Sequence, residues 1–515
     1  MCGILFYQGG LLSYSEFTYY LDNIRYRGPD VQKIETYYNN IFGFNRLSIN
    51  GLDEISNQPL MINDVILIAN AEIFNWEDLL KENPDFKYQS NSDCEIIIHM
   101  YKKYGMQKTI KSLDGEFAFV LYDKKKEKLF IGRDHLGIRG LFIGENKKEL
   151  MVCSEMKGIP TIFDIKQFPP GHYYENGTYI PYYNYNFSTI EYTEDEVYSE
   201  LNRLLTTAVK KRLMSDRPIS CLLSGGLDST LVCAIVKKLY DKPLNTYSIG
   251  LKGATDLKYA QIASDYLGTN HTTIELEEQD FLNAIKETIY VIESYDTTTV
   301  RASVGNYLVS KYIKEHSDDT VLFCGDVSDE IFGSYRGFTL APNDVQFKNE
   351  NEKMLKNIHY FDVLRSDRSI SSASLEARVP FSDKDLVNFV MSLPPQYKMF
   401  NKDVMEKMIL RKAFDGYLPD ELLYRRKEAF SDGVSSVERS WFTIIREYVD
   451  TKISDSEFAN SLNKYSYNKP YDKESLYYRE LFELYYPNKG NIIPYYWKHP
   501  FSNIQDPSAR ELNCY

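Results

Sequence analysis

The residues with the clearest chemical potential form a short turn, Ser224-Gly225-Gly226-Leu227-Asp228-Ser229. The apolar run 219–223 before it predicts a buried strand, and apolar residues at helical spacing after it predict a helix. Glycines let a backbone approach a ligand closely, and the start of a helix presents unpaired N–H groups. The turn therefore predicts an anion site, to which Ser224 and Ser229 add hydroxyl donors. Asp228 beside a phosphate implies a metal ion between them.

This turn differs from the common phosphate-binding loop, because the Walker pattern GxxxxGK[ST] does not occur in it. A Gly-Gly turn that only caps a helix is the alternative interpretation on these residues alone. The turn resembles the pyrophosphate loop of ATP pyrophosphatases, whose backbone N–H groups hold the pyrophosphate that leaves ATP. The resemblance implies adenylation of a carboxylate rather than transfer of the terminal phosphate.

A second candidate site lies at the beginning of the chain, Met1-Cys2-Gly3-Ile4. A small residue at position two permits removal of the methionine, which would make Cys2 the first residue. Its α-amino group, whose pKa lies near neutrality, can then serve as the base for its own thiol. Taken alone, a cysteine at this position is more often without function.

Further motifs follow in an order that resembles the class II glutamine amidotransferases. They occupy residues 1–4, 25–30, 46–49, 70–75, 92–95, 113–119, 132–139 and 154–157. Together with the pyrophosphate turn, they make the chain resemble the glutamine-hydrolysing asparagine synthetases over nearly all of its 515 residues.

The resemblance implies two domains of different fold. Residues 1–190 would form the glutamine amidotransferase domain, an N-terminal-nucleophile-type β-sandwich layered with helices. Residues 191–515 would form the ATP-pyrophosphatase-like synthetase domain around a Rossmann-like parallel sheet. The patterns agree, since short strand-like runs fill the first part and strands alternate with helices after 218. A capping box at Thr193 predicts the first helix of the second domain.

Two segments of the second half lack strong helical or strand patterns. Residues 345–357 are polar and charged, which favours an exposed loop. The residues after 486 contain several prolines and glycines, which favours a poorly ordered tail.

For the first site, the resemblance implies that Cys2 attacks the side-chain amide of glutamine. The amide of Asn70 and the backbone N–H of Ala71 would hold the resulting oxyanion. Arg46 would pair with the α-carboxylate of glutamine, and Asp93, helped by Glu72, would accept from its α-ammonium. The implied glutamine-binding set is Arg46, Leu47, Ser48, Ile49, Asn50, Asn70, Ala71, Glu72 and Asp93.

For the second site, the resemblance implies that the side-chain carboxylate of aspartate attacks the α-phosphorus of ATP. Ammonia then displaces AMP from β-aspartyl-AMP to give asparagine. Asp326 takes the position of the carboxylate linked to formation of this intermediate and to removal of a proton from ammonia. Asp228 and Asp329 would bind Mg²⁺. The implied ATP-binding residues are Leu222, Ser224, Gly225, Gly226, Asp228, Ser229, Ile249, Cys324, Gly325 and Lys407, the last on a helix that begins at 405–407 with Arg411 on the same face.

Four positions depart from the family pattern. The family has Gly at Ala71, and Ser, Glu and Gly at Cys324, Asp326 and Val327. These departures keep open a glutaminase-only or nonenzymatic relative that binds nucleotide. An amidating ligase that acts on another carboxylate is a further alternative, although β-lactam-forming relatives typically lack the N-terminal cysteine.

The net charge, the apolar runs and the cysteines limit which binding partners and which cellular compartment we expect. The net charge of −13 argues against nucleic acid and anionic membranes. No apolar run approaches the roughly 20 residues that span a bilayer, and the seven cysteines are scattered, so we expect a reducing, cytoplasmic setting. The expected partners are glutamine, aspartate and ATP, and a homodimer is compatible with the sequence. Because ammonia in neutral water is mostly ammonium, we expect a closed passage from Cys2 to Asp326.

Overall fold

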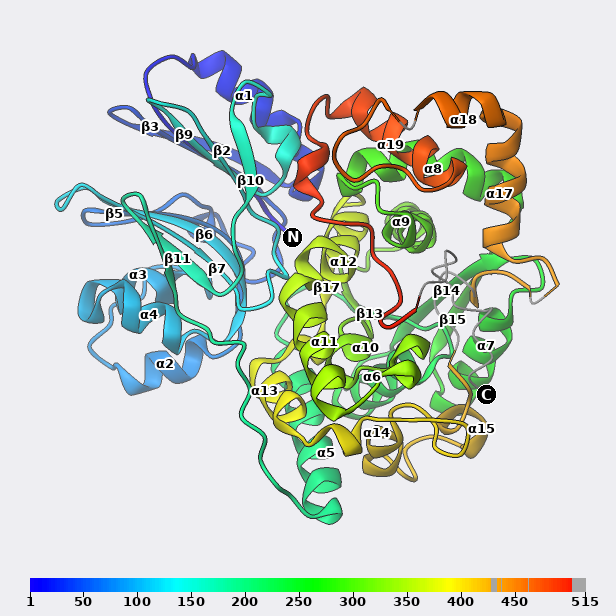
Figure 1. Ribbon diagram of the computed structural model, residues 1–515. Coiled ribbons are helices and arrows are strands. Elements are labelled where there is room, and N and C mark those ends of the chain that lie inside the picture. The colour runs from blue at the N-terminus through cyan, green and yellow to red at the C-terminus, as the bar shows by residue number, and fades with distance from the viewer. Residues whose placement is uncertain (428–432, 437, 462, 503–515) are drawn as a thin grey trace. The chain divides into compact units, whose positions relative to one another are not determined.

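The computed structural model describes residues 1–427, 433–436, 438–461 and 463–502 (Figure 1). They group into two compact units, which are described separately. The first consists of Met1–Tyr185 with two short returning segments, Met214–Pro218 and Ile370–Glu376. The second consists of Asn186–Leu213, Ile219–Ser369 and the described residues from Ala377 onward. In the described part of the chain, no helix has both the length and the apolar character to cross a membrane.

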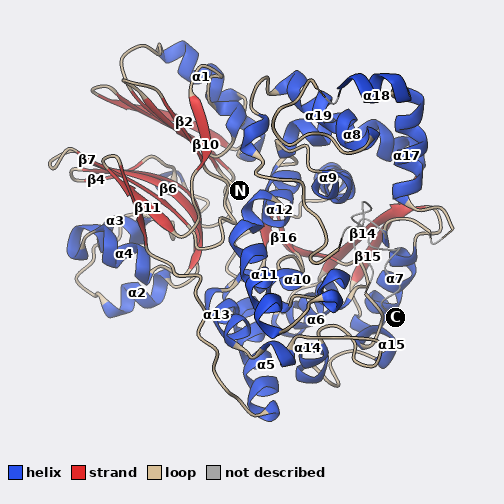
Figure 2. Ribbon diagram, viewed as in Figure 1, coloured by secondary structure: helices blue, strands red, loops and turns tan. Residues whose placement is uncertain are grey.

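The first unit contains two six-stranded sheets whose strand pairs are antiparallel (Figure 2). One sheet has the order β10-β8-β9-β1-β3-β2 and the other the order β12-β11-β7-β6-β5-β4. The strands of the first sheet are β1 (Gly3–Gln8), β2 (Val31–Tyr37), β3 (Asn40–Arg46), β8 (Phe142–Glu145), β9 (Leu150–Cys153) and β10 (Asp164–Gln167). Those of the second are β4 (Leu60–Ile62), β5 (Val65–Ile73), β6 (Gly115–Asp123), β7 (Lys128–Arg133), β11 (His172–Glu175) and β12 (Thr178–Pro181).

Alternating side chains give this unit two hydrophobic layers. Ile4 and Phe6 of β1 pack with Ile66 and Ile68 of β5 between the two sheets. The intervening residues of β5 face the other way, because successive side chains in a strand point to opposite faces. There they pack under α2 (Trp76–Glu82), α3 (Glu95–Tyr104) and α4 (Met106–Ser112), while α1 (Tyr14–Asp22) contacts β1 and β3. The predicted β-sandwich layered with helices is confirmed.

The second unit is built on a five-stranded sheet with the order β15-β14-β13-β16-β17. Strand β13 pairs in parallel with β14 and with β16, and β14 pairs in parallel with β15, as predicted for this part. The strands are β13 (Ile219–Leu222), β14 (Asn245–Leu251), β15 (Asn270–Leu276), β16 (Val321–Phe323) and β17 (Glu376–Arg378).

Helices surround this sheet. The predicted capping box is present, because the side chains of Thr193 and Glu196 cap each other's backbone at the start of α5. The helices are α5 (Glu194–Lys211), α6 (Leu227–Leu239), α7 (Thr255–Leu267), α8 (Glu278–Ile292), α9 (Thr297–His316), α10 (Ser328–Phe332), α11 (Asp344–Asn357), α12 (Asp362–Ser371), α13 (Lys384–Ser392), α14 (Met408–Ala413), α15 (Asp420–Leu423), α17 (Trp441–Lys452), α18 (Asp455–Ser461) and α19 (Lys473–Tyr485).

The exposed loop predicted for residues 345–357 is wrong. These residues form α11, which begins after Asn343, whose side chain accepts from the N–H of Gln346. Phe347, Met354 and Leu355 are buried on one side of the helix. The polar majority covers the remaining faces, so composition concealed an amphipathic helix with a narrow apolar stripe.

The prediction of a poorly ordered tail is wrong for its first part. Ile493 is fully buried, and the hydroxyl of Tyr295 donates to the carbonyl of Gly490 (2.6 Å). The N–H of Trp497 donates to Asp296 (2.7 Å). Apart from a short 3-10 helix at Gly490–Ile492, the backbone of this segment finds its partners in the second unit through such single bonds. Residues 506–510, Asp-Pro-Ser-Ala-Arg, also resemble the family's sequence, and they lie outside the described residues.

Candidate active sites

The first candidate site lies at the end of the sandwich where Cys2 enters β1. Asn70 follows Ile66 and Ile68 at even spacing on β5, so its side chain continues the face between the sheets. Cys2 packs against the same hydrophobic cluster. The Nδ2 atom of Asn70 is buried and has no hydrogen-bond partner among the described residues. A buried amide without a partner favours a ligand, because leaving such a donor unpaired costs free energy.

Ala71 lies on the opposite face of the same strand. Its methyl group packs against the cluster under α3 and α4, away from the layer that contains Asn70 and Cys2. The family's glycine at this position is therefore replaced by a residue whose side chain enters a helix-covered core.

The thiol of Cys2 lies near the terminal ammonium of Met1 and the carboxylate of Glu376. Its sulfur lies 3.6 Å from the carbonyl oxygen of Leu47. Burial raises the pKa of the Cys2 thiol more than the neighbouring N-terminal ammonium lowers it. Burial also lowers the pKa of the Met1 ammonium, although Glu376 at 3.5 Å opposes this shift.

Arg46 organises the loop after β3. Its guanidinium donates to the carbonyl oxygen of Asp53 (2.9 Å), to Oδ1 of Asn57 (2.6 Å) and to the carbonyl oxygens of Asn50 and Gly51. The amide of Asn50 in turn donates to Oε2 of Glu72 (2.6 Å). Three of the predicted glutamine-binding residues, Arg46, Asn50 and Glu72, are thereby joined in one network.

The remaining predicted residues of this site lie around that loop. Leu47, Ser48 and Ile49 are buried in it. The N–H of Ser48 donates to Asp30 (2.8 Å), and Oδ2 of Asp93 accepts from the N–H of Ile73 at the end of β5 (2.7 Å). Asp93 therefore fixes the end of the strand that carries Asn70. Its other oxygen, Oδ1, lies 3.9 Å from the sulfur of Cys94.

Two residues near Cys2 were not assigned a role from the sequence. The Nε of Arg27 donates to the carbonyl oxygen of Cys2 (3.1 Å), and its Nη1 donates to Oε1 of Glu155 (2.5 Å). Both side chains are fully buried. Arg27 belongs to the 25–30 motif and Glu155 to the 154–157 motif. The motifs themselves were visible, but only the fold shows that they meet at Cys2.

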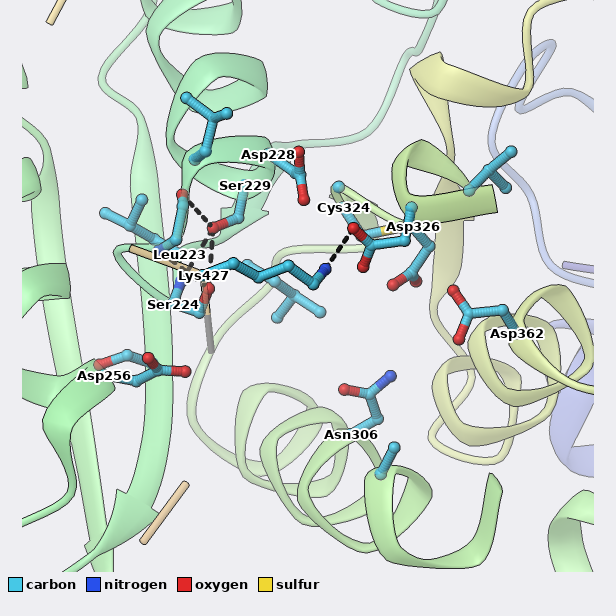
Figure 3. A pocket seen from close by; sticks show the side chains of 18 of the residues that line it. Leu223, Ser224, Asp228, Ser229, Asp256, Asn306, Cys324, Asp326, Asp362 and Lys427 are labelled. Atoms are coloured by element: carbon cyan, nitrogen blue, oxygen red, sulfur yellow. Dashed lines mark hydrogen bonds and ion pairs between the residues drawn. The ribbon is translucent and has the colours of Figure 1, made fainter. Parts of the chain in front are cut away.

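The second candidate site is a cavity of about 200 Å³ at the carboxyl ends of β13, β14 and β16 (Figure 3). Ligands of parallel α/β sheets bind at this edge. Nearly all residues predicted for ATP, metal and catalysis line it, and Gly225 is the exception. The predicted lining residues are Leu222, Ser224, Gly226, Asp228, Ser229, Ile249, Cys324, Gly325, Asp326, Asp329 and Lys407.

Gly225 shapes the turn rather than the cavity wall. Its φ is +72°, and a Cβ atom built on it would lie 2.4 Å from the backbone carbonyl carbon of Tyr259. The next residue, Gly226, is the N-cap of α6 and has an extended conformation, and no side chain of the described residues caps the helix there. The hydroxyls of Ser224 and Ser229 lie 2.9 Å apart beside this helix start. The glycine turn, the helix start and the two hydroxyls thus lie together, and that they bind an anion stays a prediction.

Two lysines converge on Asp228 and Asp329, two of the acidic residues that line the cavity. The Nζ of Lys407 lies 2.6 Å from Oδ2 of Asp228 and 2.5 Å from Oδ1 of Asp329. Lys427 also pairs with Oδ1 of Asp329, and Figure 3 shows its side chain extending across the cavity. Burial would raise the pKa of Asp329, but the two ammonium groups outweigh it and hold this pKa below its usual range. Lys427 was not assigned a role from the sequence.

The helix expected to begin at 405–407 begins later. Lys407 is the N-cap of α14 and has a left-handed backbone, with a φ of 57°. Arg411 was predicted to share a face with Lys407. It reaches the cavity wall, but its guanidinium donates to Oε1 of Glu406 (2.5 Å) and to the carbonyl of Leu423. Its charge is therefore compensated within the protein.

Comparisons with known proteins follow the same division of the chain. The family described as glutamine amidotransferase domain matches residues 1–208, and the family described as asparagine synthase matches residues 200–353 and 339–501. The asparagine synthetase (glutamine-hydrolyzing) of Homo sapiens is 39% identical over 536 aligned positions, which cover 96% of this chain and 95% of that protein. The enzymes of the same name from Cricetulus griseus and Pongo abelii show the same identity and the same coverage of both chains. The chain therefore belongs to the family of glutamine-hydrolysing asparagine synthetases.

Proposed function

We propose that this chain makes L-asparagine from L-aspartate with ATP, using ammonia that it releases from L-glutamine. The observation that supports this most directly is the coexistence of two complete sets of groups. One is a partly buried cysteine near a terminal amine and a buried amide that has no partner among the described residues. The other is an anion-binding turn with two carboxylates and two lysines in one cavity. AMP, pyrophosphate and L-glutamate would be the other products.

In the first site, the thiol of Cys2 would pass its proton to the terminal amine and attack the amide carbon of glutamine. The C–N bond would then break, with ammonia leaving with that proton, and water would hydrolyse the thioester to release glutamate. Removal of Met1 would place the terminal amine on Cys2 itself. Nδ2 of Asn70 is a suitable donor for the oxyanion, since it is buried and otherwise unpaired. Arg27 would keep the Cys2 backbone in place through its bond to the carbonyl oxygen.

In the second site, the N–H groups of the turn and the hydroxyls of Ser224 and Ser229 would hold the pyrophosphate of ATP. Lys407 and Lys427 would move from the carboxylates to the phosphates as these arrive, which spreads the charge of the leaving group. Asp326 would accept the proton of ammonia as it attacks the acyl carbon of the intermediate.

The donor set fits Mg²⁺. The carboxylates of Asp228 and Asp329 both approach one cation, the ammonium of Lys407. Mg²⁺ commonly takes one or two carboxylates together with substrate phosphates. When bound, it would neutralise phosphate charge in the cavity. We also propose a cytoplasmic location, because the cysteines of the described residues are free, as is usual in a reducing compartment.

The test separates the two sites. We expect Cys2→Ala to abolish glutamine-dependent synthesis and to leave ammonia-dependent synthesis intact, measured as asparagine and pyrophosphate formed from aspartate and Mg-ATP. Loss of both activities together would refute two separate sites. Glutamate without pyrophosphate from the unmodified chain would favour the glutaminase-only alternative. Pyrophosphate with another carboxylate, but not with aspartate, would favour a different ligase.

A further inference from the structure

The carboxylate of Asp326 is held by two neighbours on α12. Its Oδ1 accepts from Nη2 of Arg365 (2.7 Å), and its Oδ2 accepts from the hydroxyl of Ser366. Ser366 is 1% exposed and Arg365 is 6% exposed. Figure 3 shows Asp326 on the side of the cavity that faces Asp362, the first residue of the same helix. Both oxygens of the shortened side chain are therefore paired.

The loop that carries Asp326 cannot easily move to compensate for the missing methylene. A Cβ atom at Gly325 would lie 2.7 Å from the backbone nitrogen of Ser229, so the loop is packed against the first turn of α6. Val327 is fully buried with a φ of 76°, a conformation that is strained for a β-branched residue. A strained residue persists only where its surroundings determine the backbone. Groups that orient the Asp326 carboxylate must therefore be supplied by neighbouring side chains, here Arg365 and Ser366.

Arg365 alone does not fix that carboxylate. Its Nη2 is shared between Asp326 and Oδ1 of Asp362 (2.9 Å), so the guanidinium has two acidic partners. Ser366 has a single hydroxyl proton and two acceptors in reach, Asp326 and the carbonyl oxygen of Asp362 (3.1 Å). A helical serine ordinarily donates to the carbonyl four residues earlier. Here the carboxylate is the nearer and the charged acceptor, which makes the stronger bond.

We propose that Ser366 is a positioning residue that aligns the Asp326 carboxylate, and that this chain uses it in place of the reach of a glutamate. The proposal deepens the proposed function and rests on it. It requires that the hydroxyl matters with aspartate at 326 and matters much less with glutamate there, because the longer side chain would carry its oxygens past the hydroxyl.

The test is a double-mutant cycle of Ser366→Ala and Asp326→Glu, assayed with aspartate, ammonium and Mg-ATP. We expect Ser366→Ala alone to lower kcat about tenfold, with KM for ATP little changed, because one hydrogen bond to a charged group is lost. In the Asp326→Glu background the same change should cost less than about threefold. Ser303→Ala is the matched control, since this buried serine also bonds to a carbonyl of its own helix (2.6 Å) but lies away from Asp326.

Equal losses in both backgrounds, or a loss confined to KM, would overturn the proposal. Urea unfolding of the same variants measures what the hydrogen bond between Ser366 and Asp326 contributes to stability, and it does not depend on catalysis. The midpoint should fall more on Ser366→Ala with Asp326 present than with Asp326→Glu, and equal shifts would also overturn the proposal. If the unmodified chain forms no pyrophosphate with aspartate, the proposed function fails, whereas the unfolding cycle still decides whether Ser366 holds Asp326.

Discussion

At the scale of single residues, the turn before α6 depends on one backbone conformation. Gly225 is left-handed, and its missing side chain makes room for the backbone of Tyr259. Gly226 has an ordinary φ of −74°, and a Cβ atom there would meet only the Ser224 hydroxyl, at 3.3 Å. The two adjacent glycines thus differ sharply in how much they tolerate a methyl group.

We expect Gly225→Ala to reduce ATP-dependent synthesis at least a hundredfold, since the new methyl would push the turn away from α7 and misplace its N–H groups. Gly226→Ala, with the same added methyl, should lose far less. Pyrophosphate release at saturating aspartate and ammonium measures both variants, with glutamine hydrolysis as the check that each is folded. Similar losses in the two variants would show that the left-handed conformation is not what the turn requires.

The sequence predicted which residues lie together where they follow the ends of neighbouring parallel strands. The turn at 224–229, the carboxylates of Asp228 and Asp329 and the lysine at 407 meet in one cavity because strand ends of a parallel sheet share an edge. Prediction failed where partners come from distant segments. The bonds from Arg27 to Cys2 and from Ser366 to Asp326 join residues whose proximity no local pattern signals.

At the scale of elements, the long helix α9 begins at an unusual cap. Asp296 is fully buried, and its Oδ2 accepts from the N–H of Thr299 (2.9 Å) while its Oδ1 accepts from the N–H of Trp497 (2.7 Å). Burial raises the pKa of Asp296 to about 6 despite these bonds. The folded chain therefore binds a proton at this carboxyl in a pH range where the unfolded chain has lost it.

The sign of the pH dependence follows from this difference. Between pH 4 and 6 the folded state holds more protons at Asp296, so its contribution to stability falls as pH rises and is level above about pH 6, a change on the order of 3 kcal/mol. We expect Asp296→Asn to remove that decline, seen as a Tm that rises more, or falls less, from pH 4 to 6 than the Tm of the unmodified chain. Asp472→Asn, at the N-cap of α19, controls for the cap itself. A parallel decline in Asp296→Asn and the unmodified chain would contradict the assignment.

Elements with strong periodicity were predictable, and those with mixed signals were not. The helix after Thr193 carries both a capping box and an apolar face, and it forms as expected. In α11 the apolar stripe is narrow and the charges are many, so the composition favoured a loop. The helix forms because the rest of the fold supplies apolar partners for that stripe, such as Phe338, whose ring centroid lies 4.8 Å from that of Phe347.

At the scale of the whole molecule, the proposed function requires that nitrogen released from glutamine reaches the acyl adenylate. Ammonia that escapes into neutral water becomes mostly ammonium, which is not a nucleophile. A chain that hydrolyses glutamine in one unit and amidates an acyl adenylate in the other therefore gains from keeping the released nitrogen out of solvent. We expect transfer to be protected, and isotopes can measure this directly.

With unlabelled glutamine and an excess of ¹⁵N-ammonium, the amide nitrogen of newly made asparagine should come mainly from glutamine. Mass spectrometry of the product gives the ratio. The Cys2→Ala variant provides the control, because its asparagine should carry only the ¹⁵N label at the amide. If the unmodified chain instead incorporated label in proportion to free ammonium, nitrogen would be passing through bulk solvent, and the two units would work as independent enzymes on one polypeptide.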